Sequence, residues 1–170
     1  ESNAFSYSKI EDIFFPKSLI ELKERWCNET NLTKIVISPL NDQFIFKDNK
    51  YLVGKSDRNN DEFDILLFVR RDTDEFSIPP NIKIIGSDSF SKSNIEEISI
   101  PSSVTKICEG AFCNCSNLRK VEIPTNSNLQ IIERYAFSHT TIEEISIPSS
   151  VTKICENAFS GCSNLRKVEI

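Results

Sequence analysis

The sequence predicts a β-rich repeat solenoid, because two features of the chain recur at fixed spacings. Residues 95–123 reappear as residues 142–170, with identical amino acids at 26 of the 29 positions. Ile-Pro dipeptides recur at steps of 22, 23 and 24 residues. A unit of this length cannot bury its own apolar side chains, so neighbouring units must stack to form one continuous core.

The first element expected in each unit is a short strand that ends at the Ile-Pro dipeptide. In residues 118–123, apolar and charged side chains alternate, so that Val121 and Ile123 face inward and Glu122 faces solvent. Proline lacks a backbone N–H, so the strand ladder stops there and the chain turns a corner. The dipeptides are Ile78-Pro79, Ile100-Pro101, Ile123-Pro124 and Ile147-Pro148.

A second short strand and a turn complete the unit. Residues 104–107 are expected to form the second strand, with Val104 and Ile107 pointing inward from the opposite wall. The segment that contains Phe112 is predicted to form a single helical turn that places the phenylalanine ring in the centre. One column of rings is therefore expected inside the solenoid, formed by Phe90, Phe112, Phe137 and Phe159.

The amino-terminal residues follow the same template. Residues 4–16 match residues 136–148 in their pattern, and Trp26 takes the place of Phe112. Neither end of the chain carries a polar capping repeat, so we expect exposed sheet edge and core at both ends.

One longer unit is expected to carry a β-hairpin. Two apolar runs, residues 44–46 and 51–53, flank Asp48-Asn49, and asparagine tolerates the positive φ of a tight turn. We therefore divide a single continuous domain into amino-terminal repeats (residues 1–37), an expanded repeat with the hairpin (residues 38–78) and regular repeats (residues 79–170).

The repeated pattern resembles that of a known family. With x for variable positions it is IPxxVxxIxxxAFxxCxxLxxVxI, and it keeps its register over nearly the whole chain. It is similar to the leucine-rich repeats of BspA-like surface proteins from bacteria and protozoan parasites. The resemblance implies a leucine-rich-repeat fold, a right-handed coil with a parallel sheet, short second strands and single helical turns. It also implies adhesion, at a cell surface or outside the cell, to a protein ligand such as host matrix or a cell-surface protein.

The composition argues against several classes of function. The formal net charge of −5 disfavours nucleic acid as a partner, because nucleic-acid-binding proteins carry basic stripes. No apolar run within this chain is long enough to span a bilayer. The chain has a single histidine, no paired CxxC motif and no glycine-rich phosphate loop. We therefore expect no catalytic residues, no metal site and no cofactor, and hence a protein that is not an enzyme.

The six cysteines are expected to be free thiols. Cys108 and Cys155 occupy equivalent positions two coils apart, which corresponds to roughly 10 Å at the spacing of β-strands. A disulfide needs Cα atoms within about 7 Å. Free thiols are typical of intracellular proteins, so a cytoplasmic or purely structural scaffold for protein–protein interaction is the alternative to a surface adhesin.

Charged residues alternate in sign on the outward face of the main strands. Acidic pairs and basic pairs follow each other from coil to coil, which favours a structural role in strand-to-strand attraction, although a ligand could use the same residues. The pairs are Glu96-Glu97, Arg119-Lys120, Glu143-Glu144 and Arg166-Lys167.

Partner binding is instead expected where the amino-terminal half departs from the repeat. Phe14 stands where the regular repeats have Ser99, and Val36 stands where they have Glu122, so two apolar residues are expected on the outer face. Cover by the hairpin would explain this pair equally well. The predicted partner-binding residues are Phe14, Val36, Phe44, Phe46, Tyr51, Asp57, Asp61 and Asp64.

Overall fold

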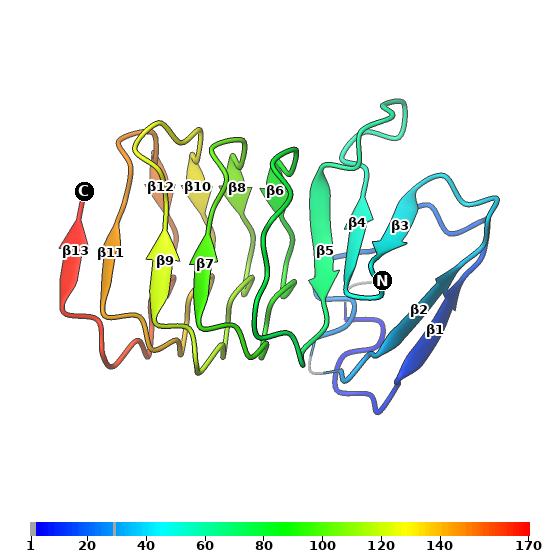
Figure 1. Ribbon diagram of the computed structural model, residues 1–170, viewed down its shortest axis with the longest axis horizontal. Coiled ribbons are helices and arrows are strands. Elements are labelled where there is room, and N and C mark those ends of the chain that lie inside the picture. The colour runs from blue at the N-terminus through cyan, green and yellow to red at the C-terminus, as the bar shows by residue number, and fades with distance from the viewer. Residues whose placement is uncertain (1–2, 29) are drawn as a thin grey trace.

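The computed structural model describes residues 3–28 and 30–170, which form a β-solenoid of short strands (Figure 1). Two walls of strands enclose its core. The front wall consists of β1 (Asp12–Phe15), β2 (Lys34–Ile37), β7 (Glu97–Ser99), β9 (Lys120–Glu122), β11 (Glu144–Ser146) and β13 (Lys167–Glu169). The back wall consists of β6 (Ile84–Ile85), β8 (Lys106–Ile107), β10 (Ile131–Ile132) and β12 (Lys153–Ile154), extended by β3 (Phe44–Lys47), β4 (Tyr51–Gly54) and β5 (Ile65–Val69) of the expanded unit.

The back wall is one continuous sheet of seven strands, in the order β12-β10-β8-β6-β5-β4-β3. The strands from β12 to β5 are parallel, and β4 and β3 then follow in antiparallel pairing. The turn between β3 and β4 holds Asp48 and Asn49 in the left-handed conformation, with φ of 54° and 50°. The predicted hairpin is therefore confirmed, and it lengthens the back wall at its amino-terminal end.

The front wall, in contrast, is divided into separate pairs of parallel strands. β1 pairs with β2, β7 with β9, and β11 with β13. No strand ladder joins β9 to β11 in the part of the chain that the structure describes. This division was not expected, because every main strand carries the same alternation of apolar and charged residues.

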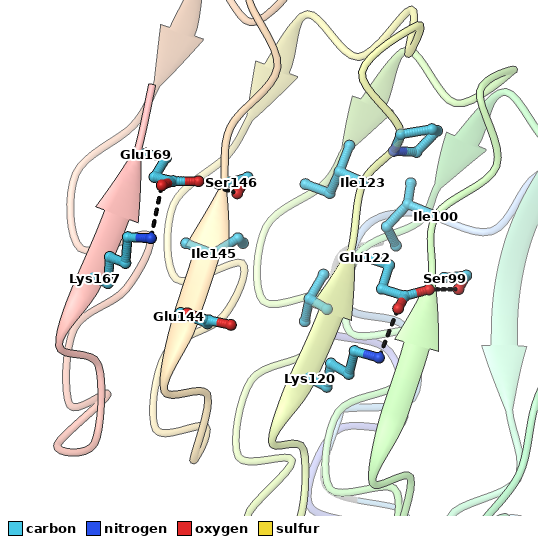
Figure 2. Close-up of a pocket in the computed structure, with 12 residues that line it drawn as sticks. Ser99, Ile100, Lys120, Glu122, Ile123, Glu144, Ile145, Ser146, Lys167 and Glu169 are labelled. Carbon is cyan, nitrogen blue, oxygen red and sulfur yellow. Dashed lines mark hydrogen bonds and ion pairs between the residues drawn. The ribbon is translucent and has the colours of Figure 1, made fainter.

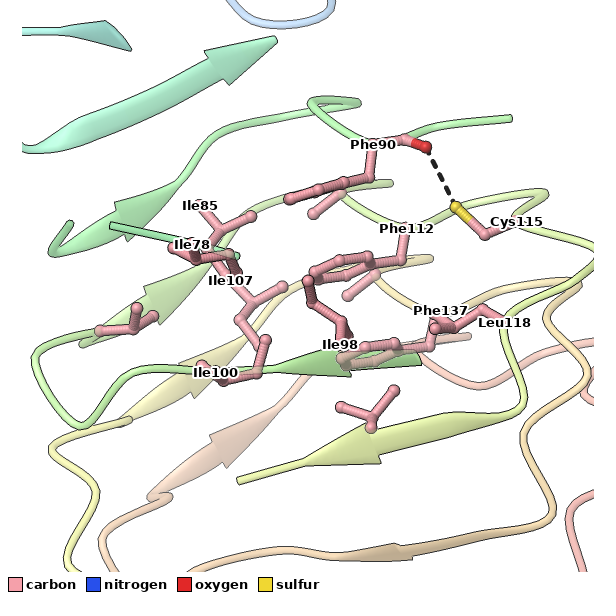
Figure 3. Packing of buried hydrophobic residues seen from close by; sticks show 14 of the residues in the cluster. Ile78, Ile85, Phe90, Ile98, Ile100, Ile107, Phe112, Cys115, Leu118 and Phe137 are labelled. Atoms are coloured by element: carbon pink, nitrogen blue, oxygen red, sulfur yellow. Dashed lines mark hydrogen bonds between the residues drawn. The ribbon is translucent and has the colours of Figure 1, made fainter. Parts of the chain in front are cut away.

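The predicted column of phenylalanine rings is present and forms the centre of the solenoid (Figure 3). The ring centroids of Phe90 and Phe112 lie 4.7 Å apart, and those of Phe112 and Phe137 lie 5.1 Å apart, in stacked geometry. Phe159 continues the stack at 5.3 Å from Phe137. Beside the column, the buried Cys115 thiol donates to the Phe90 carbonyl at 3.0 Å. All six cysteines are free thiols in the structure.

The segments around these phenylalanines form turns rather than the expected helical turns, and the described residues contain no helix. The regular coils place two residues, four positions apart, in the left-handed conformation. Backbone N–H groups then point along the solenoid axis, so that the Phe90 N–H donates to the Ala111 carbonyl of the next coil at 2.8 Å. An α-helix would direct them back to residue i−4. We call this stack of turns the turn ridge; its left-handed residues are Asn3, Tyr7, Arg25, Asp88, Lys92, Gly110, Asn114, Tyr135, His139, Asn157 and Gly161.

The expanded unit lies between two hydrophobic cores, because β4 contributes to both. Tyr51 belongs to the core of the phenylalanine column, whereas Leu52 belongs to a second, amino-terminal core. Trp26 is central to this second core, with its ring centroid 5.7 Å from that of Phe15 and 6.2 Å from that of Phe68.

Trp26 reaches the centre from a different backbone position than the sequence suggested. Arg25 adopts the left-handed conformation that precedes Ala111 in the regular repeat, with φ of 58°. Trp26 therefore occupies the place of Ala111, and Cys27 occupies the place of Phe112. Because Cys27 is small, the larger indole fills the space that a phenylalanine fills elsewhere.

Arg71 joins the two cores at a point where the expanded unit has no left-handed residue of the turn ridge. Its guanidinium donates to the carbonyls of Ser89 at 2.9 Å and Asp88 at 3.0 Å. The Ser89 carbonyl is equivalent to that of Ala111, which accepts a backbone N–H from the preceding coil. The guanidinium also stands 4.9 Å from the ring centroid of Phe68. Both carbonyls also accept a backbone N–H, from Val69 at 2.8 Å and from Ser91 at 3.1 Å, so Arg71 adds a second hydrogen bond to each of them. Burial lowers the pKa of Arg71.

At its carboxy-terminal end the solenoid exposes apolar side chains, as expected for a coil without a covering neighbour. Ile154, Val168 and Ile170 are exposed, whereas the equivalent Ile107 and Val121 of an inner coil are buried.

Candidate protein-binding surface

Phe14 and Val36 form an apolar pair on the outer face of the front wall. They lie directly opposite each other in the β1–β2 ladder. Phe15 and Ile35 point inward into the amino-terminal core, so the alternation of the strands turns Phe14 and Val36 outward. Phe14 is 59% exposed and Val36 is 44% exposed, so the hairpin does not cover them.

The regular repeats place a hydrogen-bonded polar pair at the same point (Figure 2). The Ser99 hydroxyl donates to Glu122 at 2.9 Å, and the Ser146 hydroxyl donates to Glu169 at 3.0 Å. Glu122 also forms an ion pair with Lys120 of its own strand at 2.7 Å. Hydrogen bonds from Lys120 and Ser99 hold the pKa of Glu122 below its usual value. The β1–β2 ladder thus has two apolar side chains where the other ladders have a satisfied polar network.

The aromatic residues predicted to bind a partner from the hairpin belong instead to the cores. Phe44 is buried and packs edge-on against Phe15 at 5.6 Å between ring centroids. Tyr51 is buried against Phe76 at 5.2 Å, and burial raises the pKa of Tyr51. Phe46 is half-buried against the amino-terminal core. The two cores cover the hairpin from both sides, so Phe44 on β3 and Tyr51 on β4 are not available at the surface.

Of the three acidic residues predicted on the loop between β4 and β5, one is buried and two are exposed. Asp64 is buried and accepts hydrogen bonds from the Ser56 N–H at 2.9 Å and hydroxyl at 2.8 Å. Burial alone would raise the pKa of Asp64, but these bonds and the nearby Lys83 ammonium hold it below its usual value. Asp64 therefore anchors the loop, whereas Asp57 and Asp61 are exposed on it.

The predicted charge ladder is present within the β7–β9 pair. Glu96 forms an ion pair with Arg119 of the next coil, and Glu97 lies in register with Lys120. Such exposed pairs stabilise a fold by about 0–1 kcal/mol each. These contacts agree with a structural role for the alternating charges.

An open seam separates β9 from β11 (Figure 2). The cavity there has a volume of about 490 Å³. Its lining combines the apolar side chains of Ile100 and Ile145 with the charged side chains of Lys120 and Glu144.

A second, larger seam separates residues 74–78 from β7. These residues read Asp-Glu-Phe-Ser-Ile, which parallels Glu-Glu-Ile-Ser-Ile at residues 96–100. No strand forms at residues 74–78, and no backbone hydrogen bond among the described residues joins them to β7. A cavity of about 790 Å³, which we call the acidic groove, is lined here by Lys50, Asp74, Glu75, Phe76, Ser77, Glu96 and Glu97. This groove was not expected from the sequence, although Phe76 in the position of Ile98 was a signal for it.

Neither a group of metal-binding side chains nor a helix able to cross a membrane is found in residues 3–28 and 30–170. The surface features of the front wall are an apolar pair, paired charges and two open seams. These features suit binding by apolar and electrostatic contact.

The repeat defines a class of protein that other sequences share. The chain matches the profile of the BspA type leucine rich repeat region in six copies, over residues 1–52 and 67–170. The chain therefore belongs to the BspA-type leucine-rich-repeat family, and the resemblance seen in the sequence is confirmed. Proteins built from such repeats are generally recognition modules rather than enzymes, and this chain is accordingly a protein-interaction module.

Solved structures of bacterial proteins share the fold. The pneumococcal vaccine antigen PcpA superposes with a TM-score of 0.83 at 22% identity, covering 98% of this chain and 40% of PcpA. A leucine rich cell surface protein from Faecalibacterium prausnitzii has a TM-score of 0.62 at 25% identity, covering 98% of this chain and 49% of its own. This chain thus spans about half or less of those two structures. A comparison with curated proteins finds no match.

Proposed function

We propose that this chain is a non-catalytic adhesion module that attaches a cell surface to a protein ligand, such as a host matrix protein or a protein of another cell. The contact surface comprises Phe14 and Val36 on the β1–β2 ladder, together with the exposed loop residues Asp57 and Asp61. The regular coils act as a stalk, because their faces are nearly identical and balanced in charge.

The observation that carries this proposal is the replacement of a hydrogen-bonded serine–glutamate pair by two exposed apolar side chains. Burial of apolar surface against a partner stabilises a complex by about 25 cal/mol per Å². Aromatic residues, phenylalanine included, are also enriched in the buried centre of protein interfaces. A surface location is supported by the family and by the F. prausnitzii protein, which is described as a cell surface protein.

The test is a cell-attachment assay with the variant Phe14→Ser/Val36→Glu. This variant gives the β1–β2 ladder the residues found at Ser99 and Glu122, so its fold should be preserved. We expect attachment to be abolished. The matched control is Ser99→Phe/Glu122→Val, which places an apolar pair on a regular ladder and should leave attachment unchanged.

A different outcome would relocate the binding face. Unchanged attachment of Phe14→Ser/Val36→Glu, combined with loss of attachment on charge reversal at Arg119 and Lys120, would assign binding to the charge ladder and refute the proposal.

The alternative function is an intracellular or structural scaffold, and the six free thiols favour it. Surface labelling of intact cells that express the full-length protein separates the two functions. Labelling supports the adhesion module, and protection from the label supports the scaffold.

A further inference from the structure

The alternation of charge along the front wall is interrupted at the seam between residues 74–78 and β7. In the register of the repeat, Asp74 and Glu75 precede Glu96 and Glu97, so two acidic pairs lie on neighbouring coils. Elsewhere in the regular repeats an acidic pair is followed by a basic pair. Like charges directly opposite each other destabilise a strand pair, so the two acidic pairs do not favour a ladder between residues 74–78 and β7.

Three carboxylates of the acidic groove form no ion pair within the described residues, although one of them, Glu97, lies in register with Lys120 of the next coil. Glu96 is held in an ion pair with the next coil. Asp74, Glu75 and Glu97 are exposed, and within the described residues none of them forms an ion pair. Lys50 is the one cation among the described lining residues, and its ammonium donates to the backbone carbonyl of Glu75 at 3.1 Å.

An aromatic ring lines the same groove as these carboxylates. Phe76 packs edge-on against Tyr51 at 5.2 Å and against Phe90 at 5.4 Å between ring centroids. It is only half-buried, and the remaining part of its side chain lines the acidic groove. The equivalent Ile98 in the next coil is buried. Cations bind favourably to aromatic rings, more strongly where carboxylates lie close by.

We propose that the acidic groove binds an extended peptide segment of a partner protein through an arginine or lysine side chain. The cation lies at Phe76 between the carboxylates of Glu75 and Glu97, and the peptide backbone runs beside β7. That edge of β7 has no strand partner among the described residues, and unpaired edges accept extended peptides. The volume of about 790 Å³ leaves room for an arginine or lysine side chain in the groove. The proposal rests on the protein-recognition function but does not involve Phe14 and Val36.

The test measures binding of a fluorescent peptide of alternating arginine and threonine by anisotropy at low salt. The unmodified chain should bind it, and added salt should weaken the binding. A peptide of alternating glutamate and threonine should not bind. The variant Asp74→Arg/Glu75→Lys gives this coil the basic pair of Arg119-Lys120 and restores the alternation of charge. Its affinity for the basic peptide should fall about tenfold or more.

A control with the same change in net charge separates the acidic groove from general attraction. Glu11→Arg/Asp12→Lys changes an exposed acidic pair at the start of β1, at the register position of Glu96 and Glu97, and should bind the basic peptide like the unmodified chain. Equal weakening in both variants, or no binding of the basic peptide to the unmodified chain, would overturn the proposal. The variant Phe14→Ser/Val36→Glu distinguishes this result from a failure of the proposed adhesion, because it should bind the basic peptide normally.

Discussion

The Phe112 ring is fully buried between two parallel rings, so its truncation tests the core directly. Phe112→Ala should lower the free energy of unfolding by about 3–5 kcal/mol, the usual range for a buried aromatic side chain. Denaturant unfolding measures this change. Phe14→Ala is the matched control: because its ring is 59% exposed, it should change the free energy by less than about 0.5 kcal/mol. A cost below about 1 kcal/mol for Phe112→Ala would contradict the stacked column.

For single residues, the direction of a side chain could be predicted where the chain offers a second copy for comparison. The Phe112 ring was placed correctly because Phe137 and Phe159 repeat its position. The expanded unit has no second copy, and alternation in its hairpin leaves open which face is covered. Phe44 and Tyr51 therefore looked like surface residues, although the sheet lies between two cores that cover both of its faces.

The turn ridge depends on left-handed backbone conformations, which cost a residue with a side chain about 1–2 kcal/mol. Gly110 adopts φ of 63° without this cost, and a Cβ there would lie 2.4 Å from the Asp88 carboxylate oxygen. Gly110→Ala should therefore lower the free energy of unfolding by about 1–3 kcal/mol, measured by thermal unfolding.

The equivalent position in another coil provides the control for this turn. Asn157 already has a side chain at φ of 58°, so Asn157→Gly should change stability by less than about 1 kcal/mol. A Gly110→Ala variant as stable as the parent would show that the turn does not constrain this position.

Among the elements, the strands could be predicted from alternation, but their turns and partners could not. The left-handed positions of the turn ridge are occupied by residues as different as Asp88, Gly110 and Tyr135, so no residue type marks them in the sequence. The same is true of the divided front wall, because the alternation within one strand does not report how it aligns with the next coil. The seam at residues 74–78 left two signals in the sequence, namely Phe76 in the position of Ile98 and two acidic pairs on neighbouring coils.

In the whole molecule, Arg71 holds the expanded unit to the regular coils. Arg71→Met removes the two hydrogen bonds from the guanidinium to the Ser89 and Asp88 carbonyls and should lower the free energy of unfolding by about 2–4 kcal/mol. Trp26 is the single tryptophan and lies in the amino-terminal core, so its fluorescence reports that core alone. We expect the fluorescence transition of Arg71→Met to precede the circular dichroism transition, because the two cores become uncoupled.

The conservative variant provides the control for this prediction. Arg71→Lys keeps the charge but not the planar fork of donors, so its stability should fall between those of the parent and Arg71→Met. Coincident transitions with an unchanged midpoint in Arg71→Met would show that the side chain does not join the cores.

The two walls differ in how they respond to force. Backbone hydrogen bonds run through the back wall from β12 to β3 without interruption, whereas the front wall is interrupted at its seams. When the two ends of the molecule are pulled apart, the back wall therefore resists extension more strongly than the front wall. The solenoid should therefore bend: the seams of the front wall open, while the back wall keeps its length. Curvature, rather than the unfolding of a coil, is then the first response of this protein to a pull.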